Sequence, residues 1–527
     1  MTARRARRVL LIGLDAAEPE LVERWTADGT LPHLATLRQD GAYGRIRSSA
    51  DWLVGSPWPT FYTGTHPGAH GFYHYLGWRP ERMETVRPTP DWLPLTPFWR
   101  ALGGDLRVIA VDLPLTYAPG PFGGVEISGW ATHDGLVPPS AYPADLLTWA
   151  AREVGPSPRT DEEFVMQPVR RLLAQRDEQC AATQSLADLA LALMRADPWD
   201  LCLVGFTATH RCGHKLWDET GVAGAVSPAE RVEYAGALRE VYRACDEAVG
   251  RLAEAAGPDA LLIVFSLHGM GPNTCRTDVL PEMLRRVLAR DSGAGQPVRR
   301  SGLKRLRELV PNEWRHAVKR RLPASVQDRL TAFWRLGAVD WSRTRAFPLV
   351  ADLQGYIRIN LRGREAAGVV EPGADFDALC EEISDGLRTF VDADTGEPVV
   401  RDLARTDALY PGGGRLSALP DLLVQWAESP VYAQRGIASP RFGIIPMPAP
   451  GANPSGRSGN HRPDGFAVVC GPGVAAGSAL AGGHVLDLAP TVYDALGLSP
   501  PPHFSGRPLR WASEGGGAAA AGTRMPA

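Results

Sequence analysis

The 527-residue sequence has no long apolar run, no closely spaced pair of cysteines and no marked excess of charge of either sign. No stretch approaches the roughly 18 apolar residues of a membrane-spanning helix, so we expect no membrane span and a cytoplasmic location. The 56 basic and 59 acidic residues give a formal net charge of -3, which offers no overall attraction to nucleic acid or an anionic membrane. The seven cysteines are odd in number and lack a CxxC pair, which argues against a secreted disulfide framework and favours reduced thiols.

The first residues resemble the start of a signal peptide but do not complete one. The basic segment MTARRARR is followed by only six residues, VLLIGL, before Asp15, and no cleavage site follows. We therefore interpret Val9 to Leu14 as a buried strand.

Short apolar runs recur along the chain between stretches with helical patterning. Strands that are buried on both faces have continuous apolar runs, so this rhythm predicts an α/β fold with a mostly parallel central sheet flanked by helices. In such sheets, ligands bind beyond the carboxyl ends of the strands. The expected strands are Val9–Leu14, Arg107–Val111, Leu201–Phe206, Leu261–Phe265, Leu422–Val424 and Phe466–Cys470.

The length suits one large catalytic domain, which we place at residues 1–513. Within it, residues 276–345 include a basic segment with apolar residues at helical spacing, which predicts a helical insertion. This insertion is expected to pack on the core as an amphipathic helix; contact with an anionic substrate or a membrane surface is the alternative. Residues 514–527 are expected to be a disordered tail, because they offer little apolar area to offset chain entropy.

The segment 55–75, GSPWPTFYTGTHPGAHGFYHY, combines hydroxyl residues with prolines and glycines. Such a loop can present a nucleophile, and Ser56 and Thr60 are the two candidates, because a metal ion can activate a hydroxyl group by stabilising the alkoxide. The alternative is a turn-rich loop whose hydroxyl groups cap a helix.

Four histidines stand near the ends of expected strands. His210 and His214 are four residues apart, so on a helix both rings project from one face and can bind one metal ion. His268 ends an apolar run, and His461 lies just before the last strong strand. Each of them alone could be an ordinary core or surface histidine. Together with Asp15, which follows the first run, they form a ligand set that zinc-like divalent ions prefer.

At these motifs the sequence resembles the alkaline phosphatase superfamily, in particular its branch of type I phosphodiesterases and nucleotide pyrophosphatases and the related bacterial phosphohydrolase- and phosphomutase-like proteins. The resemblance implies an alkaline phosphatase-like fold and a two-metal site in which a Ser or Thr is phosphorylated and then released by water. The matching segments follow the family's order over most of the chain: IGLDAAEPELVERWTADGTLPHLATLRQDGA, WPTFYTGTHPGAHG, VFSLHGMG, GYIRINLRGREAAGVV, LPDLLVQW, NHRPDGFAVVCGPG and LDLAPTVYDALGLSPPPHFSGRPL.

The resemblance implies a role for each candidate. Asp15 resembles the first-strand carboxylate of one metal site, and His268 resembles the histidine of the same site. His214 and His461 resemble ligands of the other metal. Ser56, which precedes a proline as the family's nucleophile does, is the preferred nucleophile, with Thr60 as the alternative.

Two positions depart from the family pattern. The family's Asp-x-x-x-His occurs here as His210 and His214, which keeps a metal ligand at both positions. The family's Asp-His after the fourth strand occurs as Leu267 and His268, and a leucine cannot bind a metal ion. The second site is therefore expected to bind its ion weakly or to prefer a different metal.

The sequence thus predicts a metal-dependent hydrolase of small phosphate esters that uses one or two divalent ions, zinc or manganese. A metal bound by His210, His214 and His461 would polarise the phosphoryl oxygen, and a covalent phosphoserine would form and be hydrolysed. One alternative is a phosphomutase- or sulfatase-like enzyme, although the sulfatase motif C/S-x-P-x-R is absent from SPWPT. The other is a catalytically impaired metal-binding or regulatory protein on the same fold.

Overall fold

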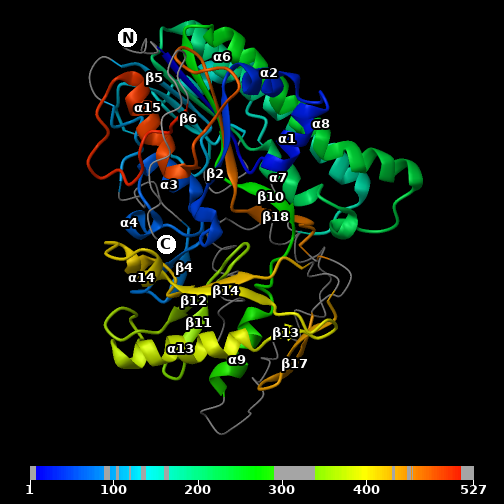
Figure 1. Ribbon diagram of the computed structural model, residues 1–527, viewed down its shortest axis with the longest axis vertical. Coiled ribbons are helices and arrows are strands. Elements are labelled where there is room, and N and C mark those ends of the chain that lie inside the picture. Colours follow the sequence, from blue (N-terminus) through cyan, green and yellow to red (C-terminus); the bar gives the residue numbers. More distant parts are fainter. Residues whose placement is uncertain are drawn as a thin grey trace.

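A computed structural model describes residues 8–87, 95–102, 106–117, 120–131, 138–159, 165–289, 339–429, 434–447, 453 and 455–511. These residues form a larger α/β part around one central sheet and a smaller part around a second sheet (Figure 1). Among the helices of these ranges, none combines the length and the apolar character needed to cross a membrane.

The central sheet is mostly parallel, as the sequence predicts. In spatial order the strands are β20 (Ser478–Ala479), β2 (Ala42–Arg47), β19 (Gly465–Cys470), β9 (Ala260–Ser266), β1 (Arg8–Leu14), β8 (Leu201–Phe206), β5 (Val108–Val111), β6 (Gly124–Ser128) and β7 (Ser140–Tyr142), with β21 (Gly483–His484) paired to β2. The five strands from β9 to β6 run parallel to one another. In contrast, β19 is antiparallel to both β9 and β2, and β7 is antiparallel to β6.

Helices cover both faces of this sheet, which explains its continuous apolar strands. In β1, Leu10 and Ile12 pack into the core on one face, and Val9 and Leu11 pack into the core on the other. The first face is covered by α1 (Pro19–Ala27), α2 (Pro32–Asp40), α5 (Leu146–Val154), α6 (Val169–Ala196), α7 (Ala208–Lys215) and α8 (Pro228–Ala256), and the second by α3 (Pro57–Thr63) and α15 (Leu488–Leu496), with α4 (Pro67–His70) following α3 (Figure 1).

The smaller part contains a separate antiparallel sheet, which was not predicted from the sequence. Its order is β11 (Ala346–Pro348), β12 (Gly355–Ile359), β15 (Leu422–Trp426) and β14 (Val400–Arg405), and α9 (Leu280–Leu288) and α13 (Ala374–Arg388) pack against it. The run Leu422–Val424, expected in the main sheet, is part of β15. Leu422 and Val424 face one apolar cluster and Leu423 faces another, so this antiparallel strand is buried on both faces like a parallel one.

Short elements connect and border the two parts. Among them, the two-stranded ribbon of β10 and β18 carries His461. The elements are the pair β3 (Gly77–Arg79) and β4 (Glu84–Val86), the pair β10 (Gly269–Pro272) and β18 (Gly459–Arg462), the sheet β13 (Val391–Asp392), β16 (Gly436–Ser439) and β17 (Gly443–Pro446), the helix α14 (Thr406–Leu409), and the 3-10 turns η1 (Ser49–Asp51), η2 (Glu219–Gly221), η4 (Leu416–Ala418) and η6 (Val485–Asp487).

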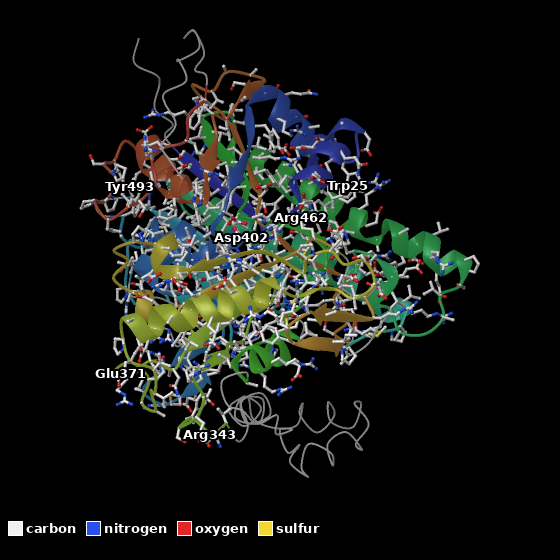
Figure 2. All side chains as sticks on the ribbon, turned by 60° about the horizontal axis from the view of Figure 1, so that its bottom comes forward. Trp25, Arg343, Glu371, Asp402, Arg462 and Tyr493 are labelled. Carbon is white, nitrogen blue, oxygen red and sulfur yellow. The ribbon has the colours of Figure 1, made fainter. Side chains whose placement is uncertain are left out.

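Most of the predicted insertion at 276–345 lies outside the described residues, including the basic segment with helical spacing. Its first part is α9, whose buried side chains belong to the core of the smaller part. The predicted tail at 514–527 also lies outside the described residues. Figure 2 labels Trp25 and Tyr493 on the larger part and Arg343 and Glu371 on the smaller part.

Candidate active site

The candidate site lies where three neighbouring strands of the main sheet end. Asp15 directly follows β1, and its N–H donates to the carbonyl of Phe206 at the end of β8 (2.8 Å). β8 leads into α7, which carries His210 and His214, and His268 follows β9 on the other side of β1. Because parallel strands end at the same edge of a sheet, residues distant in the sequence meet here.

The two-stranded ribbon β10–β18 brings His461 to this edge, with Met270 as its partner across the ribbon. One ring nitrogen each of His210, His214 and His461 can be chosen so that all three lie within 4.8 Å of one another. The ring centroids of His461 and His268 are 4.7 Å apart. The structure therefore brings together the five predicted metal-binding residues, Asp15 and the four histidines.

Hydrogen bonds orient two of these rings. Nδ1 of His210 lies 2.8 Å from Oδ2 of Asp15, and Nδ1 of His214 lies 2.9 Å from the carbonyl oxygen of Gly459. Carboxylate and carbonyl oxygens accept hydrogen bonds, so both Nδ1 atoms carry the proton. When these rings are neutral, each Nε2 atom then has a lone pair that a metal ion can use, and the two Nε2 atoms are 3.0 Å apart.

Burial favours the neutral form of His214, His461 and His268. It lowers the pKa of His214 and of His461 well below 6.5, and the positive charge of Arg457 adds to the effect. Burial also lowers the pKa of His268 to about 4, although the charge of Asp15 opposes this shift. Neutral imidazole is the form that binds a metal ion.

These features fit a divalent cation. Two facing lone pairs repel each other unless a positive charge lies between them, and two nitrogens on one tetrahedral zinc ion lie about 3.4 Å apart. In addition, Nδ1 of His461 and Nδ1 of His268 are buried without a hydrogen-bond partner in the described structure. A buried polar atom that lacks a partner costs free energy, which a bound ion or substrate can recover.

The surroundings of the expected second metal site are less polar. Leu267 is 1 % exposed and packs in the apolar cluster that covers the second face of the sheet. Nε2 of His268 lies 3.7 Å from Oδ1 of Asp15. The same carboxylate oxygen accepts a hydrogen bond from the indole Nε1 of Trp58 (2.8 Å).

The two predicted nucleophiles occupy a buried hydrogen-bonded chain. Ser56 is fully buried, and its hydroxyl donates to the carbonyl of Leu53 (2.6 Å) and lies 2.8 Å from the hydroxyl of Ser49. The Thr60 hydroxyl lies 3.2 Å from Ser49 Oγ and 3.1 Å from His70 Nε2. Within the described ranges, neither hydroxyl is hydrogen-bonded to Asp15 or to the four histidines of the site.

Two features of the site were not predicted from the sequence. The first is Trp58, which donates to Asp15. Trp58 lies in the segment that was considered for its hydroxyl groups, and from the sequence alone a tryptophan at this position looks like an ordinary core residue. The second is a polar group in which Asp352 interacts with His74 Nε2 (3.1 Å) and Arg457 (3.3 Å). Burial opposes ionisation of Asp352, but the nearby His74 and Arg457 hold its pKa well below its usual range.

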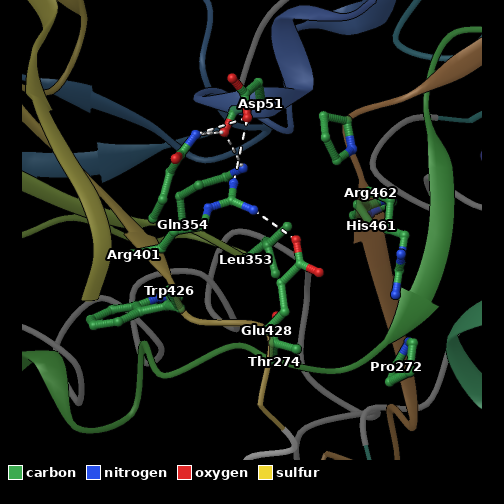
Figure 3. A pocket seen from close by; sticks show the side chains of 12 residues that line it. Asp51, Pro272, Thr274, Leu353, Gln354, Arg401, Trp426, Glu428, His461 and Arg462 are labelled. Carbon is green, nitrogen blue, oxygen red and sulfur yellow. Dashed lines mark hydrogen bonds and ion pairs between the residues drawn. The ribbon is translucent and has the colours of Figure 1, made fainter. Parts of the chain in front are cut away.

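A pocket opens beside His461, between the main part and the second sheet (Figure 3). Arg401 of β14 bridges Asp51 and Glu428, with distances of 3.6 and 2.7 Å, on one side of this pocket. On the other side, Arg462 follows His461 along β18. The pocket thus joins the histidine cluster to a region with charges of both signs.

Comparison with known proteins identifies relatives of this chain. Residues 9–435 match the family model described as type I phosphodiesterase / nucleotide pyrophosphatase. No curated protein matches the sequence.

Two solved structures of one protein share the overall fold of this chain. Phosphonoacetate hydrolase from Sinorhizobium meliloti 1021 in complex with phosphonoformate has a TM-score of 0.53 at 12% sequence identity, covering 93% of this chain and 96% of that chain. Its complex with phosphonoacetate has a TM-score of 0.51 at 13% identity with the same coverage. Murine ectonucleotide pyrophosphatase / phosphodiesterase 5 in complex with AMP has a TM-score of 0.48 at 12% identity, covering 94% of this chain and 96% of that chain. The first two confirm the predicted alkaline phosphatase-like α/β fold.

Proposed function

Because the chain belongs to the type I phosphodiesterase and nucleotide pyrophosphatase family, a family of phosphoester hydrolases, we propose that it hydrolyses small phosphate esters with a divalent metal ion at the histidine cluster. The observation that carries the proposal is the position of the Nε2 atoms of His210 and His214, 3.0 Å apart and adjacent to His461. Zinc is the preferred ion because its usual ligands include imidazole nitrogen, and manganese is the alternative.

His210, His214 and His461 would hold the ion, which would supply a Lewis acid for a phosphoryl oxygen. Asp15 and the carbonyl of Gly459 fix the orientation of two of the rings through their Nδ1–H groups. The third ring, His461, also lines the pocket that we propose for the organic group of the ester. Arg462 lines the same pocket, and its positive charge can attract an anionic group there.

Ser56 remains the proposed nucleophile, with Thr60 as the alternative. Before its oxygen can attack phosphorus and form a phosphoserine, Ser56 must break its hydrogen bond to Leu53. The covalent route therefore includes a local rearrangement of this buried chain. Turnover by the Ser56→Ala variant tests the route, because direct attack by water does not need the Ser56 hydroxyl.

The test of the proposed function combines metal analysis with hydrolysis of p-nitrophenyl phosphate and bis-p-nitrophenyl phosphate. We expect purified protein to contain bound zinc or manganese and to hydrolyse at least one ester, with activity lost on chelation and restored by the metal. His214→Ala should lose both the metal and turnover. The matched control is His503→Ala, which removes an exposed histidine outside the cluster and should retain both.

The second candidate function is a metal-binding protein without catalytic activity. It is favoured by the hydrogen-bonded Ser56 and by the apolar Leu267 beside the site. Metal binding at the cluster without turnover of either ester would contradict the hydrolase proposal and support this candidate.

A further inference from the structure

Both oxygens of the Asp15 carboxylate accept hydrogen bonds from ring N–H groups. We propose that the site holds a single divalent cation through His210, His214 and His461, and that Asp15 is a positioning residue for His210 rather than a ligand of a second ion. This inference rests on the proposed function, and it departs from the two-metal site that the family resemblance implies.

One oxygen of Asp15 holds His210. The distance from Oδ2 to Nδ1 of His210 is 2.8 Å, and both side chains are largely buried. By accepting the Nδ1 proton, the carboxylate directs Nε2 of His210 at Nε2 of His214. A carboxylate that accepts the second ring N–H of a metal-binding histidine fixes the tautomer and ring orientation and makes the imidazole more basic.

The other oxygen of Asp15 faces Trp58. The indole Nε1–H can only donate, and it is 2.8 Å from Oδ1. Trp58 is 4 % exposed and is packed against Phe61 and Phe265, with ring centroids 5.9 and 6.0 Å away. The ring is therefore held in place, and the positive end of its N–H dipole points at this oxygen, which disfavours a second cation on it.

The remaining groups do not complete a second site. Leu267 offers no ligand atom, and the Ser56 hydroxyl donates to the carbonyl of Leu53. A second ion would have Asp15 and His268 as its protein ligands, whereas zinc sites in proteins use three or four. The three-histidine cluster meets this requirement with one open position for a substrate or water.

The experiment measures metal stoichiometry and affinity rather than activity. The full-length protein is loaded with excess Zn²⁺, freed of unbound metal and analysed for zinc per chain, and its affinity is measured by competition with a chelator. The same measurements are made for Asp15→Asn. The control is Asp246→Asn, which changes a buried carboxylate that accepts the backbone N–H groups of His33 and Leu34 away from the cluster.

We expect one zinc ion per chain in the wild type and in both variants. Asp15→Asn should bind zinc about 10- to 100-fold more weakly, because the amide cannot accept both ring N–H groups as the carboxylate does. Asp246→Asn should bind with unchanged affinity. After Co²⁺ substitution, wild type and Asp15→Asn should share the intense visible bands of a four-coordinate site, because the three imidazole ligands are the same.

Two zinc ions in the wild type and one in Asp15→Asn would overturn the inference while leaving the proposed hydrolase intact. Unchanged affinity in Asp15→Asn would show that Asp15 does not position His210. A wild type without bound metal would overturn both proposals. If Asp15→Asn does not fold, the wild-type stoichiometry still decides between one ion and two.

Discussion

At the residue scale, the hydroxyl groups of the candidate loop form a hydrogen-bonded chain. The N–H of Phe72 donates to Nδ1 of His70, so Nε2 of this neutral ring carries the proton that is donated to Thr60. At the other end of the chain, the Ser56 hydroxyl is the donor toward both the carbonyl of Leu53 and Ser49 Oγ. Ser49 and Thr60 share the hydrogen bond between these ends, in which either hydroxyl can donate.

Ser56→Ala should lower the free energy of unfolding by about 1–3 kcal/mol, because the buried Leu53 carbonyl and Ser49 hydroxyl oxygens lose their donor. Thr60→Val interrupts the same chain and should cost a similar amount. Denaturant unfolding of both variants measures the loss. Unchanged stability in both would contradict the chain, and the turnover of the two folded variants separates the nucleophile from a purely structural hydroxyl.

His70 should make the protein less stable in acid. Burial lowers its pKa to about 3, whereas in the unfolded chain the pKa is about 6.5. Between these values the unfolded state binds the extra proton, so the contribution of His70 is fully present above pH 6.5 and declines as the pH falls. At pH 5 the loss from this group is about 2 kcal/mol.

The measurement is the unfolding free energy of wild type and His70→Gln at pH 7 and pH 5. We expect the variant to be less stable at pH 7, and the difference to narrow by about 2 kcal/mol at pH 5. His503→Gln, an exposed histidine, serves as the control and should follow the wild type. Parallel pH dependences of wild type and His70→Gln would contradict the prediction.

The histidine cluster could be predicted from the sequence because each member stands next to a strand end or at helical spacing. The hydrogen-bond partners of these residues could not be predicted in this way. Trp58 and Asp15 are separated by 43 positions, and Gly459 and His214 by 245, so their hydrogen bonds depend on how the elements pack. The hydrogen bonds of Ser56 also depend on packing. The sequence alone does not show whether its hydroxyl group is free to react or is held by Leu53 and Ser49.

At the element scale, the ribbon β10–β18 and helix α7 are in close contact at Gly459. A Cβ atom on Gly459 would lie 2.1 Å from the carbonyl oxygen of Gly213 in α7, which is too close for any side chain. The carbonyl oxygen of Gly459 also accepts the hydrogen bond from His214. This contact therefore sets how far α7 lies from the ribbon that carries His461.

Gly459→Ala should push α7 away from the ribbon, lowering stability by about 1–3 kcal/mol and weakening metal binding. Gly236→Ala is the matched control, because a Cβ at this helical position meets nothing within 4 Å. It should raise stability by up to about 1 kcal/mol, since alanine favours the helix. Unfolding and zinc titration measure both effects, and similar results for the two variants would contradict the role of the contact.

The sequence predicts where strands occur, but it does not predict which sheet each strand belongs to. The run Leu422–Val424 is as apolar as the strands of the main sheet, because clusters cover both of its faces. Its antiparallel pairing with β12 and β14 has no signature in the run itself. Burial determines the composition of a strand, and the connections between strands determine which sheet contains it.

At the scale of the whole molecule, the second sheet is docked onto the segment that leads to the candidate nucleophile. The side-chain Nε2 of Gln354 donates to the carbonyl oxygens of Ala50 (2.7 Å) and Asp51 (3.1 Å). Nε2 of Gln425 in β15 donates to the carbonyl oxygen and to Oδ1 of Asp51, both at 2.8 Å. Both glutamines are nearly buried, so water cannot readily replace these bonds.

Gln354→Leu should therefore loosen the segment between Ser49 and Ser56 without unfolding the main sheet. The leucine keeps much of the side-chain volume but removes the side-chain donor to the Ala50 carbonyl oxygen and one of the two donors to the Asp51 carbonyl oxygen, at a cost of about 1–3 kcal/mol. Hydrogen–deuterium exchange should become faster in peptides covering residues 49–56, whereas peptides from β1 and β9 keep their protection. Gln184→Leu, which removes a hydrogen bond to the Ala244 carbonyl between α6 and α8, should leave exchange at 49–56 unchanged. Equal exchange at 49–56 in wild type and Gln354→Leu would mean that the second sheet does not hold this segment in place.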